Sequence, residues 1–248
     1  MVRNCANFAN EKDNWDKSYA NGDNFVFYPH EEVIRFVSKY IRKRIGFNEF
    51  IDVKQSSLSS SFSDGELSTK KILDLGCGIG RHVKFCWEMG LDPYGVDLSE
   101  IAVTEARKWL SSTQFPNPEF RIVQSDARNL PWKNNTFSYA VSHGVLDSMP
   151  FEISRAACIE LARIMEPGGL FYCDLISGDD SFHSREFSGE EIVNTLHEKD
   201  TTQLYFNMSL IHELIEGSFS IKSCKLLRSE DVFLGTYTSR YHIVLQCL

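Results

Sequence analysis

One segment restricts the possible folds of this chain more than any other: an apolar run at residues 72–75 is followed by three alternate glycines, Gly76, Gly78 and Gly80. Glycine lets the backbone turn tightly and approach a ligand closely, and a helix that begins next presents unpaired N–H groups in its first turn. The pattern favours a strand, a glycine loop and a helix that bind a nucleotide-like cofactor. Three glycines are also compatible with an ordinary strand-to-helix turn.

From residue 70 onward, short apolar runs alternate with segments of helical periodicity, which is typical of parallel strands joined by covering helices. At 248 residues and 42% hydrophobic content, a single large α/β domain with a doubly wound sheet is the simplest fold class. Strands are expected at 71–75, 93–97, 119–124, 137–142, 170–176 and 219–228, helices at 81–89, 100–110, 152–165 and 209–216, and a last strand in which Tyr241, Ile243 and Leu245 share one face.

The sequence before residue 71 differs in character from this core. Residues 31–44 carry apolar side chains at helical spacing, with acids at the start and bases at the end. Seven serines lie between residues 55 and 69, a composition that buries too little surface to order itself strongly. We therefore expect an N-terminal helical cap at 1–46, a flexible serine-rich linker at 47–70 and a core at 71–248.

Two acidic residues follow predicted strands. Asp97 ends the second strand 21 residues after Gly76, where a carboxylate can accept hydrogen bonds from both ribose hydroxyls of a nucleotide. Asp126 follows the third strand and is suited to an exocyclic amine, although aspartate at such a position is also common as a helix cap or turn residue.

Four motifs in order resemble those of the class I S-adenosylmethionine-dependent methyltransferases. Residues 74–80 (DLGCGIG) are similar to the family's D-x-G-x-G-x-G cofactor loop, and residues 94–99 (YGVDLS) to its acidic second strand. Residues 126–137 match the adenine-binding region, and residues 161–169 (LARIMEPGG) resemble the helix and turn before the fifth strand.

This resemblance implies a Rossmann-like sheet of seven strands, mostly parallel with an antiparallel last strand, that binds S-adenosylmethionine and releases S-adenosylhomocysteine. The glycine loop would surround the methionine part of the cofactor, Asp97 the ribose and Asp126 the adenine. Aromatic lids cover the cofactor in many relatives, so Trp15 and Tyr19, four residues apart, could form one, or could simply pack against the fold. The residues expected to bind the cofactor are Trp15, Tyr19, Asp74, Gly76, Cys77, Gly78, Gly80, Asp97, Leu98, Asp126, Ala127 and His143.

A dehydrogenase is the nearest rival, because it also places an acid about 20 residues beyond a glycine loop. Its fingerprint is G-x-G-x-x-G, whereas the third glycine here follows after one residue, and no Tyr-x-x-x-Lys pair comes later. The spacing therefore favours the methyltransferase.

Family topology places the loop at residues 142–150 beside the transferring methyl group. We expect Asp147 to be the catalytic base or to orient the acceptor, with His143 a second base or a cofactor contact. A hydroxyl acceptor benefits from a base, whereas an amine need only arrive unprotonated. The alternatives are that Asp147 caps the helix beginning near Phe151 and that His143 is a core histidine.

The acceptor is expected to be a small hydrophilic molecule: a sugar, a sugar nucleotide or an amine. A net charge of -8 gives no general attraction to nucleic acid, and the segment 177–208, an insertion predicted to cover the acceptor and to add a strand within 195–205, is polar. Scattered cysteines without a C-x-x-C pair and the lack of a long apolar run predict a cytoplasmic protein that binds no metal and no membrane. A non-catalytic cofactor-binding sensor or partner subunit is the alternative, and the oligomeric state stays open.

Overall fold

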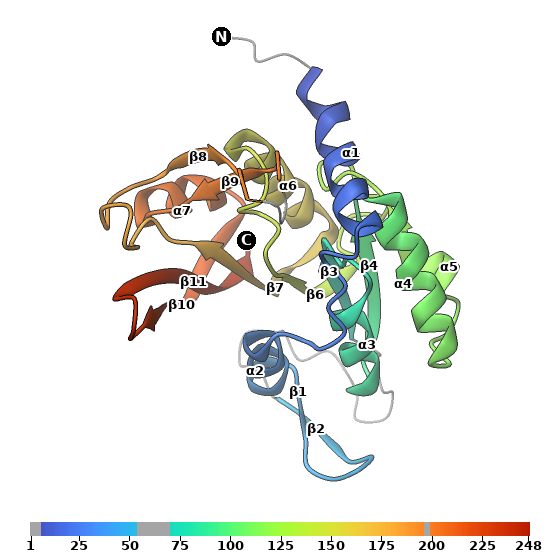
Figure 1. Cartoon of the computed structure of the whole chain (residues 1–248). Coiled ribbons are helices and arrows are strands. Elements are labelled where there is room, and N and C mark those ends of the chain that lie inside the picture. The colour runs from blue at the N-terminus through green and yellow to red at the C-terminus, as the bar shows by residue number, and fades with distance from the viewer. Residues whose placement is uncertain (1–5, 54–69, 196–198) are drawn as a thin grey trace.

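A seven-stranded sheet with the strand order β10-β11-β7-β6-β3-β4-β5 forms the centre of the molecule (Figure 1). The computed structural model describes residues 6–53, 70–195 and 199–248, with side chains from residue 11. The strands of this sheet are β3 (Lys71–Leu75), β4 (Asp92–Asp97), β5 (Ile122–Gln124), β6 (Phe137–Ser142), β7 (Met165–Ile176), β10 (Phe219–Asp231) and β11 (Thr236–Cys247), and the helices of the chain are α1 (Ala6–Ala20), α2 (Glu31–Tyr40), α3 (Arg81–Glu88), α4 (Glu100–Ser112), α5 (Pro118–Arg121), α6 (Phe151–Ile164) and α7 (Met208–Ile215).

The five strands from β7 to β5 in this order are parallel, and β11 runs antiparallel to both β7 and β10. The predicted Rossmann-like architecture with an antiparallel last strand is therefore confirmed. The chain runs outward from β3 through β4 to β5, and then returns to place β6 on the other side of β3. Ligands of open α/β sheets bind at such a switch point, outside the carboxyl ends of the strands.

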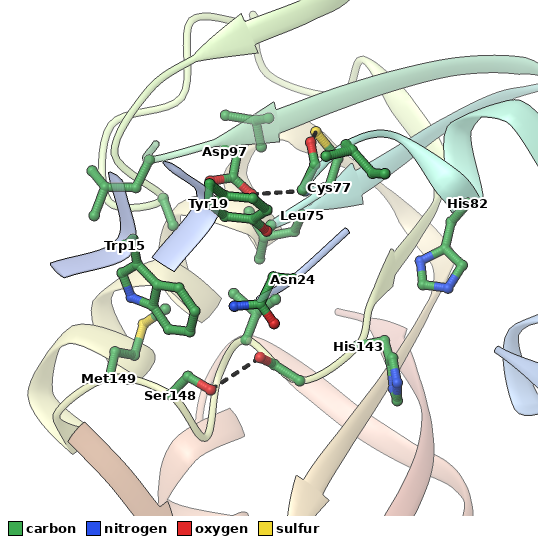
Figure 2. Close-up of a pocket in the computed structure, with 18 of the residues that line it drawn as sticks. Trp15, Tyr19, Asn24, Leu75, Cys77, His82, Asp97, His143, Ser148 and Met149 are labelled. Carbon is green, nitrogen blue, oxygen red and sulfur yellow. Dashed lines mark hydrogen bonds between the residues drawn. The ribbon is translucent and has the colours of Figure 1, made fainter. Parts of the chain in front are cut away.

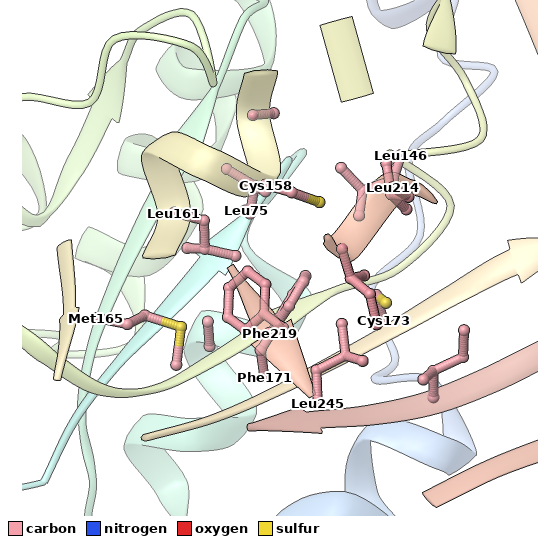
Figure 3. Close-up of a cluster of buried hydrophobic side chains, with 14 of the residues drawn as sticks. Leu75, Leu146, Cys158, Leu161, Met165, Phe171, Cys173, Leu214, Phe219 and Leu245 are labelled. Carbon is pink, nitrogen blue, oxygen red and sulfur yellow. The ribbon is translucent and has the colours of Figure 1, made fainter. Parts of the chain in front are cut away.

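Two layers of helices cover the sheet because successive side chains of a strand point to opposite faces. Leu73, Phe171 and Leu245 pack against α6 and α7 on one face, and this is the largest buried cluster (Figure 3). Ile72 and Tyr139 point to the other face and pack with residues of α2 and α3. Burial of both faces fixes the register of the strands, and with it the positions of the loops at their carboxyl ends.

The N-terminal region differs from the expectation in one respect. The helix predicted at 31–44 ends at Tyr40, and β1 (Arg42–Arg44) pairs antiparallel with β2 (Phe50–Asp52), inside the segment predicted to be linker. Arg42 is buried and donates to Asp52 at 2.6 Å across this hairpin, which favours the paired strand over a further helical turn. The serine-rich residues 54–69 lie outside the described residues.

Two further predictions need correction. Of the strand expected at 119–124, only the last three residues, β5, are a strand. Pro118 begins the short helix α5, which takes up the residues before them. The insertion after β7 contains two strands, β8 (Gly189–Ile192) and β9 (Thr202–Tyr205), which pair antiparallel, where one strand was predicted. The polar, glutamate-rich sequence of β8 gives no alternating apolar signal that would have revealed it.

Candidate cofactor and acceptor site

A pocket of about 1150 Å³, its mouth included, opens at the carboxyl ends of β3, β4 and β6, and residues of α1 line it from above (Figure 2). Ten of the residues predicted to bind the cofactor line it: Trp15, Tyr19, Gly76, Cys77, Gly78, Asp97, Leu98, Asp126, Ala127 and His143. Predicted motif positions that are far apart in sequence thus meet at the switch point of the sheet.

The glycine loop is shaped so that only glycine fits at two positions. Gly76 and Gly78 have φ values of +71° and +53°, in the left-handed region that side chains disfavour. A Cβ atom on Gly76 would lie 2.3 Å from the side chain of Val145, and one on Gly78 would lie 2.7 Å from the phenol oxygen of Tyr19. The loop backbone therefore lies in direct contact with the loop after β6 and with α1, which carries Trp15 and Tyr19 and which we call the lid helix.

Asp97 joins the end of β4 to the glycine loop. Its carboxylate accepts the backbone N–H of Gly78 at 2.8 Å and that of Ser99 at 2.9 Å. Burial of the carboxylate outweighs these hydrogen bonds and raises its pKa to about 6. Each carboxylate oxygen accepts one of these bonds and keeps capacity for another donor, which suits a pair of ribose hydroxyls.

Residues after β5 form the wall at which the resemblance places adenine. Ser125, Asp126 and Ala127 line the pocket beside Leu98. The carboxylate of Asp126 accepts the backbone N–H of Arg128 at 2.9 Å and pairs with its guanidinium at 2.6 Å. Asp126 thus also makes the turn that was the alternative interpretation of this position.

Hydrogen bonds to the start of α4 hold the helix α1 over the pocket. Ser99 donates its hydroxyl to Asp16 at 2.6 Å, and the N–H of Ile101 points to the same carboxylate oxygen. Figure 2 shows Tyr19 in front of Asp97, and Trp15 beside Met149 at one end of the pocket. Trp15 and Tyr19 both line the pocket, so a cofactor lid stays the prediction for them.

Histidines occupy the other end of the pocket, where Figure 2 shows His82 and His143. The Nδ1 atom of His143 lies 2.7 Å from a carboxylate oxygen of Asp174, and this histidine is 16% exposed. The ring of His30, from the segment between α1 and α2, stacks on His143 with centroids 3.9 Å apart. His143 is therefore held on one nitrogen by Asp174 and covered on one face by His30.

Two predicted cofactor residues do not line the pocket. Asp74 is 2% exposed, and its carboxylate faces His82 at 3.6 Å beneath the loop. Gly80 is the N-cap of α3 and lies against Leu110 of α4. Strand alternation turns Asp74 toward the face that α2 and α3 cover, and Gly80 begins α3, so both residues lie behind the loop.

The predicted position of Asp147 is wrong. Its side chain is 1% exposed, lies outside the pocket lining, and accepts the N–H of Ile176 and the guanidinium of Arg240, each at 2.8 Å. A carboxylate engaged in this way cannot reach an acceptor in the pocket. It does not cap α6 either, because the N-cap is Pro150.

Several polar residues of the site were not identified from the sequence. Asn24 and Arg81 line the pocket, and Asp174 and Arg240 lie behind His143. Two of these positions carried a usable signal: Arg81 directly follows the glycine loop at a helix start, and Asp174 is the single charge in the apolar run at residues 170–176. The partner of Asp174 comes from β11, 66 residues later, and no local pattern predicts that contact.

The residues present fit S-adenosylmethionine. A glycine loop that excludes side chains, a partly buried carboxylate at the end of the adjacent strand and an aromatic lid surround one continuous pocket. No helix in the described part of the chain has the length and apolar character to cross a membrane.

Known proteins with similar sequences and structures support the same assignment. Residues 73–173 match the family model described as a methyltransferase domain. An uncharacterized protein of Rickettsia prowazekii is 27% identical over 188 residues, which cover 71% of each chain. The tRNA (carboxymethyluridine(34)-5-O)-methyltransferase of Saccharomyces cerevisiae is 28% identical over 104 residues, 41% of this chain and 34% of the yeast enzyme.

A solved structure covers the whole chain. The 1,6-didemethyltoxoflavin-N1-methyltransferase of Burkholderia thailandensis, with bound 1,6-didemethyltoxoflavin and S-adenosylhomocysteine, has a TM-score of 0.67 at 14% identity, over 100% of this chain and 92% of its own. Likeness at this identity concerns the fold. Together with the family match, it defines the class of domain: residues 73–173 are a methyltransferase domain in a class I fold, and the match supports S-adenosylmethionine as the methyl donor.

Proposed function

We propose that this protein transfers the methyl group of S-adenosylmethionine to a small hydrophilic acceptor, a sugar, a sugar nucleotide or an amine, and that His143 takes up the acceptor's proton. The observation that carries this proposal is the His143 to Asp174 contact of 2.7 Å at the wall of the cofactor pocket. A cytoplasmic location stays a prediction.

The chemistry assigned to His143 follows from its contacts. When bound, the cofactor would supply a methyl group on a positively charged sulfur, and the bond from the methyl carbon to that sulfur would break as an acceptor lone pair bonds to the carbon, leaving S-adenosylhomocysteine. The Nδ1 atom of His143 lies 2.7 Å from Asp174, which favours the tautomer with its proton on Nδ1 and leaves Nε2 as the nitrogen that can accept the acceptor's proton. For a hydroxyl acceptor, the O–H proton passes to Nε2 as the new O–CH3 bond forms, and solvent receives it after product release. The lid helix and the glycine loop align the reactants and exclude water.

The polar character of one end of the pocket favours a hydrophilic acceptor. Asn24, Arg81 and His82 line the pocket in addition to the residues expected to contact the cofactor, and His143 lines it as well. The acceptors named for similar proteins differ, a tRNA for the yeast enzyme and 1,6-didemethyltoxoflavin for the Burkholderia enzyme. The net charge of -8 supports the small-molecule class over nucleic acid here.

The test is formation of S-adenosylhomocysteine with a panel of sugars, sugar nucleotides and amines, followed by His143→Gln on any acceptor that reacts. For a hydroxyl acceptor, the variant should lower turnover about 10²- to 10⁴-fold and leave cofactor affinity nearly unchanged. His212→Gln, an exposed histidine on α7, is the matched control. Turnover near the wild-type level in His143→Gln contradicts the role of the base, and cofactor binding without turnover across the panel favours the non-catalytic binder.

A further inference from the structure

Behind His143 lies a compact group of charged side chains, which we call the acid–base cluster and define as His143, Asp174, Arg240 and Asp147. The Nη1 atom of Arg240 donates to Asp174 and to Asp147, each at 2.8 Å. Asp174 also accepts the backbone N–H of Gly144 at 2.9 Å, next to its contact with His143. The side chains of Asp147 and Asp174 are fully buried, so one guanidinium bridges two buried carboxylates.

The other titratable groups that face His143 are mostly held neutral. His30 stacks on it and accepts the N–H of Glu32 through Nδ1, and burial lowers the pKa of His30 to about 4. His242 forms a hydrogen bond with Tyr172 at 2.8 Å, and burial lowers its pKa as well.

On the remaining side, His82 lies edge-on to His143 with centroids 5.9 Å apart and faces the buried Asp74 at 3.6 Å. Arg81 lines the same pocket. Of the ionisable groups around His143, Asp174 is the one in contact with its Nδ1 atom, and Asp174 is bound in turn to Arg240.

The charges of the cluster do not cancel while His143 is neutral. Burial opposes ionisation of Asp174, but the hydrogen bond from His143 and the charge of Arg240 hold its pKa below its ordinary value. Burial and the neighbouring Asp174 raise the pKa of Asp147. With both carboxylates ionised, the single guanidinium leaves one negative charge, and a proton on His143 neutralises it. A low local dielectric makes this balance effective at close range.

We propose that Arg240 and Asp147 are positioning residues that set the proton affinity of His143 with opposite signs, Arg240 lowering it and Asp147 raising it. Neither residue touches the nitrogen that accepts the proton; both act through Asp174. The catalytic meaning of this inference rests on the proposed role of His143 as the base. It also gives a function to Asp147, whose carboxylate belongs to the same loop as His143 but points into the protein.

Nuclear magnetic resonance of protein labelled with ¹⁵N in its histidine rings tests the proposal without an acceptor. The pH titration of His143 is followed with S-adenosylhomocysteine bound, and the signal is assigned by its loss in His143→Gln. Arg240→Met should shift the titration midpoint of His143 upward, and Asp147→Asn should shift it downward, each by a change in proton affinity of roughly tenfold. The double variant carries the same net charge as the wild type, so its midpoint should return toward the wild-type value.

Two conservative variants distinguish a change in proton affinity from a simple loss of folding. Asp147→Asn keeps an oxygen for the N–H of Ile176 and for Arg240, and Arg240→Lys keeps the charge, so its midpoint should stay near that of the wild type. A merely structural role predicts either no shift or shifts of one sign. Unchanged midpoints in Arg240→Met and Asp147→Asn, or shifts in the same direction, overturn the proposal. Opposite shifts combined with full turnover of His143→Gln uphold this inference while refuting the proposed base.

Discussion

Cofactor affinity should depend on pH through Asp97. In the protein without cofactor, its carboxylate accepts the N–H groups of Gly78 and Ser99, and burial raises its pKa to about 6. Two ribose hydroxyls that donate to the same group stabilise the ionised form, and only that form accepts all four hydrogen bonds. Binding should therefore release the proton that Asp97 holds at low pH.

The magnitude follows from the pKa of Asp97. At pH 5, with a pKa of about 6, roughly one molecule in ten carries the ionised carboxylate. The dissociation constant of S-adenosylhomocysteine should then be about tenfold higher at pH 5 than at pH 7, which is ~1.4 kcal/mol. Above pH 7 it should be constant with respect to this group, and at pH 6 binding should release about half a proton.

Calorimetric titration in two buffers of different ionisation enthalpy measures both the affinity and the proton release. Asp97→Ala should lose the pH dependence along with about 1–3 kcal/mol of binding free energy, the cost of removing a charged hydrogen-bonding partner. Asp126→Asn is the matched control: despite its burial, Arg128 holds the pKa of Asp126 below its ordinary value, so this group does not titrate near pH 6. A constant affinity from pH 5 to 7 with no proton release would refute the assignment of the ribose to Asp97.

The remaining predictions concern the loop, the lid and the N-terminal cap. Gly78→Ala should abolish cofactor binding in calorimetry, because its Cβ would lie 2.7 Å from a phenol oxygen of the lid, whereas Gly217→Ala, with a φ of +73° and no neighbour within 4 Å, should show similar backbone strain but normal binding. Asp16→Ala removes the 2.6 Å hydrogen bond from Ser99 and should speed dissociation of S-adenosylhomocysteine about five- to tenfold in stopped-flow fluorescence; an unchanged rate would show that α1 does not limit release. The folded protein holds the pKa of His30 at about 4 against an ordinary value of 6.5, so the stability it contributes is complete above pH 6.5 and is lost as the pH falls toward 4. Between pH 7 and pH 5, the unfolding free energy of the wild type should therefore fall by about 2 kcal/mol more than that of His30→Asn, as urea titrations measure it. An equal fall in both proteins would contradict the buried neutral ring.

The sequence predicted the core of the fold because periodicity and glycine positions are local signals. The glycine loop, and the short apolar run around Ile72 and Leu73 that alternates with helical segments, were sufficient to predict the parallel sheet and its switch point. The errors lie where tertiary contacts decide the structure. Arg42 lies in a strand because Asp52 and the carbonyl oxygen of Gly90 accept its hydrogen bonds, and neither contact is visible in its helical neighbourhood.

The cofactor side of the site was predictable for the same reason, and the catalytic side was not. Asp97 stands at a fixed distance from the loop, so spacing alone located it. The role of Asp147 could not be judged locally, because an aspartate in the loop after a strand has the same local sequence whether it faces a ligand or a partly buried arginine. Arg240, which decides its orientation, lies 93 residues away on β11.

The pH dependence that arises from Asp97 and the one that arises from His30 have different causes, but both favour function above about pH 6. For Asp97 the folded pKa of about 6 exceeds the ordinary 3.8, so the stability it contributes is complete below pH 3.8 and is lost as the pH rises through 6, by up to about 3 kcal/mol in the protein without cofactor. Ionised Asp97 is the form predicted to bind ribose, so the cofactor should restore at neutral pH what burial of the carboxylate costs. His30 changes in the opposite direction, because its neutral ring stabilises the cap only at higher pH. Below pH 6, weaker cofactor binding and a weaker N-terminal cap therefore coincide, and an acid limb in the pH profile of turnover at limiting cofactor reports binding as well as the ionisation of the base.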